Sequence, residues 1–305
     1  MIEAEGVTKQ FDDFVAVNAL SMSVAAGEIL ALLGPNGAGK TTTVRMLAAI
    51  LKPTSGRALI CGHDGALYPD IVRRSVGLLT EYPGLYLRME GREYLDFYGQ
   101  LYGLDAETRQ KRGKRLLEQF GMEEAWGRRI GEYSKGMQQK MALARTLLHD
   151  PPVLLLDEPT SAMDPYSAKL VRDTIQSLQN QHRAILVCTH NLAEAEVLAN
   201  RIAIIRRGRI VALGTSGELK RQLVGPPVME LRVNGAFETA LSLVSQRVQV
   251  VEHGYGWIRY ETETPESTNP HLVWALAQAN VDVITLSERE RSLESVYLQA
   301  VGGVT

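Results

Sequence analysis

The stretch "GPNGAGKTT", residues 34–42, constrains the fold of this chain more than any other. It fits the pattern G-x-x-x-x-G-K-[ST], follows the apolar run "EILALLG" and precedes the helix-like run "KTTTVRMLAAI". A strand, a glycine-rich turn and a helix in that order place backbone N–H groups where they can surround phosphate oxygens. An unliganded glycine turn would explain the glycines, but not a lysine and a threonine in register. The sequence therefore predicts a phosphate-binding loop in an α/β fold.

This loop supplies candidate ligands for ATP and its magnesium ion. We expect Lys40 to reach the β- and γ-phosphates and the Thr41 hydroxyl to bind Mg²⁺. The other loop residues expected to bind the nucleotide are Gly34, Pro35, Asn36, Gly37, Ala38, Gly39 and Thr42.

A second stretch, "VLLLDEP" at 153–159, is an apolar strand that ends in two carboxylates. Asp157 is placed to hold the magnesium ion, directly or through water. Glu158 is the candidate general base or water-positioning group for attack on the γ-phosphate. An exposed acidic pair at a strand end is common, but beside a phosphate-binding loop the catalytic interpretation is favoured.

Strand and helix signals alternate from residue 1 to about residue 215, with a mostly helical stretch at about 90–130. This pattern predicts an ATP-binding domain over 1–222 with a mixed or parallel sheet and a helical subdomain at about 82–150. The stretch "QLVGPPVMEL" is typical of a linker. Beyond it, residues 228–305 follow the order β-α-β-β-α-β, which predicts a small α+β, ferredoxin-like accessory domain with a closing helix.

Composition excludes several classes of protein. The 305 residues carry 33 basic and 35 acidic side chains with no basic stripe, so we expect no nucleic-acid partner. No apolar run approaches the ~18 residues that span a bilayer, and the N-terminus does not read as a secretory signal. We therefore expect a cytoplasmic protein without a membrane span of its own. Cys61 and Cys188 lie in apolar, strand-like surroundings and are expected to be buried free thiols.

Three stretches together, "GPNGAGKTT", "YSKGMQQKMALARTLLHDPPVLLLDEPTSAMDP" and "VCTHNLAEAE", resemble the ATP-binding subunit of an ATP-binding-cassette (ABC) transporter. The resemblance covers about residues 2–220, and its motifs agree in order and spacing. The tail, ending in "SLESVYLQAVGG", resembles the multidrug and antibiotic-exporter branch of that family.

The resemblance implies further site residues. In this family the signature helix of one subunit faces the phosphate-binding loop of the other, which would place Ser134, Gly136 and Gln138 at a nucleotide of the partner subunit. His190 resembles the switch histidine at the γ-phosphate, although a strand-end histidine is more often structural. Asp164 matches a loop that bridges the subunits, and it also fits a plain helix cap. Phe11 matches the aromatic residue that stacks on adenine, although Phe14 is close and either ring could belong to the core.

Three positions depart from the family pattern. Glu81 stands where the family usually has a glutamine that contacts Mg²⁺; its carboxylate can ligate the metal but adds negative charge beside a triphosphate. Lys135 and Ala162 each replace a glycine that is usual in the family. Lys135 keeps the backbone N–H donor and adds a cation, so we expect function to survive there, and Ala162 leaves Asp164 in place.

The predicted function is therefore that of an ATPase subunit that dimerises around two ATP molecules and drives transport, in the direction of export. The implied partners are an integral membrane permease subunit and a second ATPase subunit, either a copy or a paralogue, at the inner face of the cell membrane. The alternatives are a cassette ATPase acting on DNA or ribosomes and a P-loop phosphotransferase. The 93 residues between Lys40 and Ser134 show no sustained heptads, unlike the DNA-repair members. A phosphotransferase would leave "YSKGMQQK", "SAMDP" and "CTH" unexplained.

Overall fold

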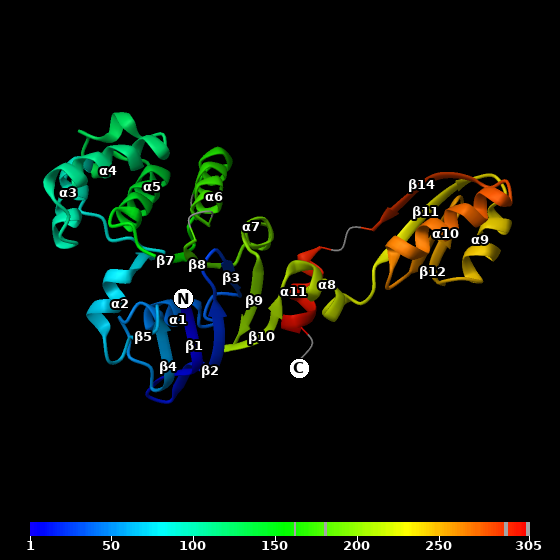
Figure 1. Ribbon diagram of the computed structural model, residues 1–305, viewed down its shortest axis with the longest axis horizontal. Helices are drawn as coiled ribbons and strands as arrows, with labels where there is room; N and C mark the ends of the chain where they lie inside the picture. Colours follow the sequence, from blue (N-terminus) through cyan, green and yellow to red (C-terminus); the bar gives the residue numbers. More distant parts are fainter. Residues whose placement is uncertain (162, 180–181, 290–291, 303–305) are drawn as a thin grey trace. The chain divides into compact units, whose positions relative to one another are not determined.

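A computed structural model describes residues 1–161, 163–179, 182–289 and 292–302, so the expectation for Ala162 lies outside the described residues. The chain divides into two compact units, Met1–Ser216 and Gly217–Thr305. Figure 1 shows the first unit in colours from blue to yellow-green and the second in colours from yellow to red.

A six-stranded sheet forms the centre of the first unit. Its strands lie in the order β10-β9-β3-β8-β7-β6; all neighbours are parallel except β10, which is antiparallel to β9. Every residue of β3, β7 and β8 is buried, as expected for central strands covered on both faces. The predicted mixed sheet is confirmed. The strands are β3 (Ile29–Leu33), β6 (Val76–Leu79), β7 (Val153–Asp157), β8 (Ala184–Thr189), β9 (Arg201–Arg206) and β10 (Arg209–Gly214).

The N-terminal part of the first unit is a separate antiparallel sheet. Its strands, in the order β2-β1-β4-β5, are β2 (Phe14–Val24), β1 (Ile2–Phe11), β4 (Ser55–Ile60) and β5 (His63–Asp64). The alternation of strands and helices expected from residue 1 is wrong here, because β1 and β2 join directly in a hairpin with Phe11 opposite Phe14. Asp12 takes a positive φ of 47° in the short turn, a conformation that tight hairpin turns require.

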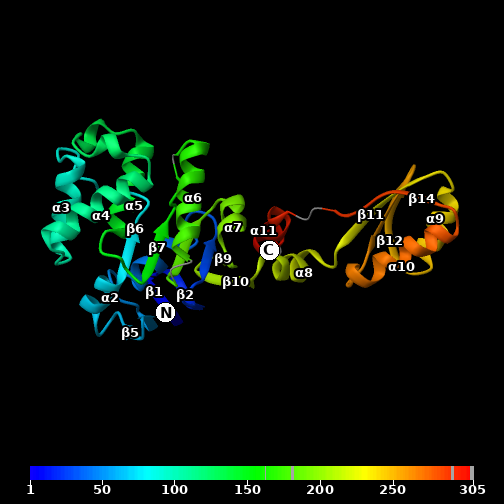
Figure 2. The ribbon, with the colours of Figure 1, turned by 45° about the horizontal axis from the view of Figure 1, so that its top comes forward.

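Helices surround the central sheet. Helix α1 (Lys40–Leu47) follows the phosphate-binding loop, and the other helices next to the sheet are α2 (Pro69–Ser75), α6 (Pro165–Gln179) and α7 (Leu192–Leu198). Figure 2 shows α3 (Gly91–Leu101), α4 (Ala106–Gln119) and α5 (Lys135–Leu147) gathered into a lobe at one side of the unit. Short 3₁₀ turns at Glu123–Ala125 and Ile130–Glu132 connect α4 to α5.

The helical lobe packs directly on the sheet. Tyr94, Phe120 and Met141 of the lobe share a buried cluster with Leu154 and Leu156 of β7. Helix α5 and β7, the strand that ends in the acidic pair, therefore belong to one close-packed core.

The second unit contains the elements in the predicted order. They are α8 (Ser216–Val224, which begins at the last residue of the first unit), β11 (Val228–Asn234), α9 (Phe237–Ser245), β12 (Gln249–Gly254), β13 (Trp257–Glu261), α10 (Pro265–Gln278), β14 (Asp282–Glu288) and α11 (Leu293–Gly302). The strands form an antiparallel sheet in the order β12-β13-β11-β14. Alternate residues of β11 and β13, such as Leu231 and Tyr260, pack on Val244 of α9 and Leu272 of α10, so both helices cover one face.

Two further expectations concern cysteines and membrane segments. Both cysteines are free, as predicted. Cys188 lies fully buried in β8, but Cys61 follows β4 in a turn with φ of 50° and is only half-buried, so the strand-like assignment of Cys61 is wrong. Among the described residues, no helix combines the length and the apolar character needed to cross a membrane.

Candidate functional site

A cavity of about 460 Å³ opens at the carboxyl ends of β3, β7 and β8. Ligands bind at this edge of open α/β sheets, because the loops that follow the strands converge there. The cavity is lined by Phe14, Ala16, Asn36, Gly37, Gly39, Lys40, Thr41, Thr42, Glu81, Asp157, Glu158, Ser161 and His190. Most of the residues predicted from the phosphate-binding loop and both residues of the acidic pair thus meet in one place.

The glycines of the loop allow close backbone approach. Gly39 has a φ of 108°, and a Cβ at this position would lie 2.6 Å from the Ala16 carbonyl oxygen. A Cβ on Gly34 would lie 2.5 Å from the Ile205 carbonyl oxygen. Both contacts are with backbone atoms that side-chain rotation cannot move, so a larger residue at either position would displace the loop.

Lys40 is the cation of the cavity. It is 7% exposed, and its Nζ donates hydrogen bonds to the Gly34 oxygen at 2.7 Å and the Pro35 oxygen at 3.2 Å. These contacts hold the ammonium group above the loop at the start of α1. A lysine at this place supplies positive charge to phosphate oxygens.

Thr41 and Asp157 are joined across the cavity floor: the Thr41 hydroxyl donates to Asp157 Oδ2 at 2.8 Å. Burial raises the pKa of Asp157, and the negative charges of Glu158 and Glu81 raise it further, while the Thr41 hydrogen bond and Lys40 oppose the rise. A buried carboxylate beside other acids favours a bound cation. The oxygens of Thr41, Asp157 and Glu81 line the same cavity and form the hard ligand set that Mg²⁺ prefers.

Glu158 is held at the end of β7 in an unusual conformation. It is 8% exposed and has a positive φ of 51°, which bends the chain directly after Asp157. Its Oε1 accepts from the His190 backbone N–H at 3.1 Å and lies 2.7 Å from His190 Nδ1. Its carbonyl oxygen accepts from Gln139 Nε2 of α5 at 3.3 Å. A strained backbone fixed by several partners is typical of functional sites.

The signature residues lie outside this cavity. Ser134 is exposed and caps α5, because its hydroxyl oxygen accepts from the Met137 N–H at 3.2 Å. A Cβ on Gly136 would meet only Ser134 Oγ, at 3.9 Å. Gln138 Nε2 donates to the Tyr133 oxygen at 3.3 Å. The described part of the chain does not bring these three residues to its own phosphate-binding loop.

Asp164 is likewise outside the cavity. Its side chain accepts from the Ser167 N–H at 3.0 Å at the start of α6, the arrangement of a plain helix cap. Gly34, Pro35 and Ala38 belong to the loop but do not line the cavity.

The aromatic residue at the cavity is Phe14, not Phe11. Phe14 is 64% exposed and lines the cavity, whereas Phe11 is 43% exposed and its ring lies 5.1 Å from the Lys9 ammonium. The two residues pair across the hairpin turn, but only Phe14 lines the cavity. Sequence reasoning did not single out Ala16 and Ser161 either; neither carries a distinctive chemical signal.

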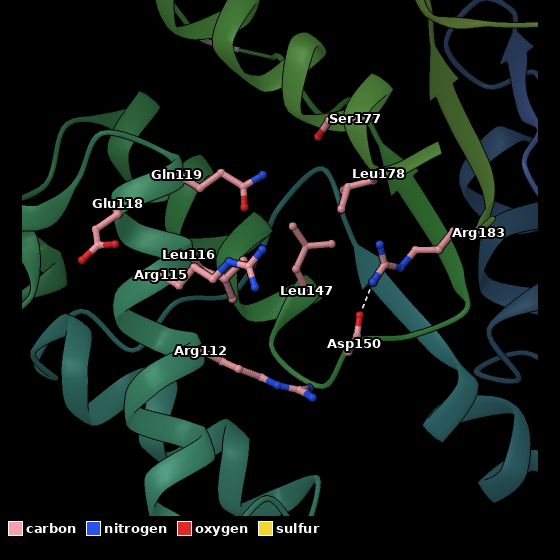
Figure 3. Close-up of a pocket in the computed structure, with 10 residues that line it drawn as sticks. All are labelled: Arg112, Arg115, Leu116, Glu118, Gln119, Leu147, Asp150, Ser177, Leu178 and Arg183. Atoms are coloured by element: carbon pink, nitrogen blue, oxygen red, sulfur yellow. Dashed lines mark hydrogen bonds and ion pairs between the residues drawn. The ribbon is translucent and has the colours of Figure 1, made fainter. Parts of the chain in front are cut away.

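A second cavity, of about 610 Å³, contains none of the predicted residues. Figure 3 shows it between α4 and the segment around Asp150, with Arg112, Arg115 and Arg183 at its walls. Arg183 pairs with Asp150 and its Nε donates to the Pro151 oxygen at 2.9 Å, while Arg112 donates to the Leu148 oxygen at 3.3 Å. Arg112 and Arg183 thus brace the connection between α5 and β7.

Known proteins are similar to this chain in sequence and in architecture. Residues 17–161 match the family described as ABC transporter. The chain is 35% identical over 308 residues to the daunorubicin/doxorubicin resistance ATP-binding protein DrrA of Streptomyces peucetius, covering 99% of this chain and 92% of that protein. It is 33% identical over 301 residues to Nod factor export ATP-binding protein I of Rhizobium sp. (strain N33), covering 99% and 97%.

Solved structures of ATP-binding cassettes superpose on this chain. The ATP-binding subunit of an ABC transporter superposes with a TM-score of 0.69 at 29% identity, covering 74% of this chain and 94% of that one. A dimeric bacterial ABC transporter cassette, MJ0796, superposes with a TM-score of 0.66 at 24% identity, covering 70% and 98%, which supports the fold alone. The resemblance seen in the motifs is confirmed by proteins aligned along nearly the whole chain. This chain belongs to the ATP-binding proteins of ABC transporters.

Proposed function

We propose that this ATPase works in an exporter as one of a pair of subunits at the inner face of the cell membrane, with Mg²⁺ as its metal and a separate integral membrane subunit as its partner. Residues 1–222 would form the ATP-binding domain and residues 228–305 an accessory domain. Support for export comes from the relatives, whose names refer to drug resistance and to Nod factor export.

The observation that carries the proposal is the meeting of Lys40, Thr41, Asp157, Glu158 and His190 at one cavity. Lys40 and the loop N–H groups would bind the β- and γ-phosphates. Thr41, Asp157 and Glu81 would hold Mg²⁺, which neutralises phosphate charge when bound. Glu158 would orient the attacking water, and His190, hydrogen-bonded to Glu158, would contact the γ-phosphate.

The signature helix would complete the site across a dimer. The N-terminus of α5, a helix of 13 residues, presents backbone N–H groups and partial positive charge near Ser134. It serves no phosphate in its own chain, and a partner's γ-phosphate is the ligand such a terminus suits. Two ATP molecules bound from both sides would hold the pair closed, and hydrolysis would reopen it, which is a population shift driven by differential affinity.

The helical lobe is the proposed docking region for the membrane subunit, over about residues 82–130. Large apolar side chains are exposed there: Tyr82 is 82% exposed, Tyr86 48% and Leu87 53%. Because this segment directly follows Glu81, which lines the cavity, movement of a docked partner would shift Glu81 relative to the bound nucleotide.

The role of Glu158 is tested by Glu158→Gln, which keeps the size of the side chain and removes its ability to take a proton. We expect ATP binding to be unchanged and steady-state ATPase turnover to fall by about 10²-fold or more. Glu118→Gln, an exposed acid of α4 outside the cavity, is the matched control and should retain full turnover. An unimpaired rate for Glu158→Gln would refute the assignment.

A further inference from the structure

Glu194 is a buried carboxylate directly behind the candidate site. It lies in the first turn of α7 and is 3% exposed. Its Oε1 accepts from the Thr160 hydroxyl at 2.6 Å, and its Oε2 accepts from the Thr189 hydroxyl at 2.7 Å. Thr160 follows the acidic pair and Thr189 precedes His190, so this one carboxylate joins the two chain segments that carry Glu158 and His190.

The Thr189 hydroxyl has two carboxylates within reach but only one proton. Its Oγ1 lies 2.7 Å from Glu194 Oε2 and 3.4 Å from Glu158 Oε2. It also accepts from the Asn191 N–H at 3.0 Å, which fixes the hydroxyl in place. The shorter contact takes the proton, because hydrogen bonds weaken steeply with distance and 2.7 Å is ideal for a hydroxyl and a carboxylate.

This competition leaves the two oxygens of Glu158 in different states. Oε1 is engaged by the backbone N–H of His190 and lies beside its ring, whereas the hydroxyl nearest to Oε2 points to Glu194. An acceptor that is already saturated by a protein donor is a poorer acceptor for water. Oε2 is therefore the oxygen of Glu158 that remains available to a water molecule.

We propose that Glu194 is a positioning residue for hydrolysis: by holding the Thr189 proton, it keeps Glu158 Oε2 open to the attacking water. This inference rests on the role of Glu158 in the proposed function. In that step the water oxygen bonds to the γ-phosphorus, and the bond from that phosphorus to the bridging oxygen breaks, with its electron pair leaving on ADP. The proton lost by the water passes to Glu158 Oε2.

A carboxylate suits position 194 because each of its two oxygens accepts from one of the two hydroxyls. A glutamine offers one acceptor oxygen to Thr160 and Thr189 together, and a methionine offers none of comparable strength. A methionine therefore releases the Thr189 proton, and a glutamine releases it in the amide orientation that turns its NH₂ group to Thr189; the next acceptor is Glu158 Oε2 at 3.4 Å.

The test combines changes at Glu194 with removal of the Thr189 hydroxyl. We expect kcat for ATP hydrolysis to fall about threefold in Glu194→Gln and about tenfold in Glu194→Met, with KM for ATP unchanged, because an interaction with the attacking water is lost while substrate binding is kept. Adding Thr189→Val to either variant removes the misdirected proton and should restore most of kcat. ATP-dependent dimerisation on a sizing column should be unaffected throughout. Thr174→Val removes another buried threonine hydroxyl, one bonded to Leu170 within α6, and controls for loss of stability alone.

Recovery in the double variant separates this role from a merely structural one, since two destabilising changes at contacting residues would not restore turnover. A double variant as slow as the Glu194 single variant, or a Glu194→Met enzyme with normal kcat, would overturn the inference. If Glu194→Met does not fold, Glu194→Gln with and without Thr189→Val decides the question. Failure of this cycle while Glu158→Gln remains inactive would leave the proposed function standing.

Discussion

Glu81 lines the cavity together with the buried Asp157, so a second carboxylate lies at the proposed Mg²⁺ site. A bound divalent cation would be held by both carboxylates and would neutralise their charge. Without it, these two acids would repel a bound triphosphate, and this repulsion would be only partly screened near a protein surface. The effect of Glu81 on ATP affinity is therefore expected to depend on whether the metal is present. This dependence distinguishes the role of Glu81 from that of Asp157.

We predict that Glu81→Gln keeps Mg²⁺-dependent ATPase activity within about twofold, since an amide oxygen is also a Mg²⁺ ligand. In excess chelator, the same change should tighten ATP binding about three- to tenfold, because one repulsive charge is removed. Titration of a fluorescent ATP analogue with and without Mg²⁺ measures both effects, with the exposed Glu124→Gln as control. An inactive Glu81→Gln enzyme would show that this acid takes a part in the chemistry that differs from metal binding.

For single residues, sequence motifs predicted correctly those whose position depends only on the short segment that contains them. Lys40 and Thr41 follow from the loop and helix that contain them, and Asp157 from the end of its strand. Phe14, and not Phe11, lines the cavity, and no motif separates the two rings, because they stand three residues apart at either side of one hairpin turn. The contact between Thr189 and Glu194 has no sequence signature, since it depends on how a helix cap folds back on a strand end.

Among the elements, helix α5 both contributes to the core and exposes its N-terminus. Its buried side packs in the core shared with β7, and its exposed N-terminus carries Ser134. Apolar runs predicted β3, β7 and β8, whose strands are uniformly buried, and helical spacing predicted α3 and α4. The β1–β2 hairpin was missed because alternation of strands and helices was extended to the N-terminus, where consecutive strands pair instead.

We predict that Ser134→Arg prevents ATP-dependent dimerisation while ATP binding by the monomer persists. The arginine places bulk and positive charge at a helix N-terminus that would contact the partner's nucleotide, and it removes the cap of α5. Sizing chromatography in the Glu158→Gln background, which would keep ATP intact, is the measurement. Ser134→Ala is the matched control: it loses the cap, at a cost of about 1 kcal/mol, but leaves the surface open for pairing. If Ser134→Arg also abolished ATP binding, α5 would be serving the site of its own chain.

For the whole molecule, the central question is whether one copy holds a complete catalytic site. The cavity is lined by the phosphate-binding loop, Glu81, the acidic pair and His190, and by no residue from the N-terminus of α5. If the site needs that terminus from a partner, only the dimer hydrolyses ATP.

We predict that the ATPase rate per molecule falls in proportion to concentration once the protein is diluted well below the dimer dissociation constant, because the dimer fraction then follows mass action. Excess Glu158→Gln protein should restore the ATPase rate of dilute wild-type protein, because in a mixed dimer the variant supplies the N-terminus of α5 to the wild-type site. Excess Glu158→Gln/Ser134→Arg protein should not restore it. A rate per molecule that stays constant on dilution, in a sample that sediments as a monomer, would mean that each chain hydrolyses ATP unaided.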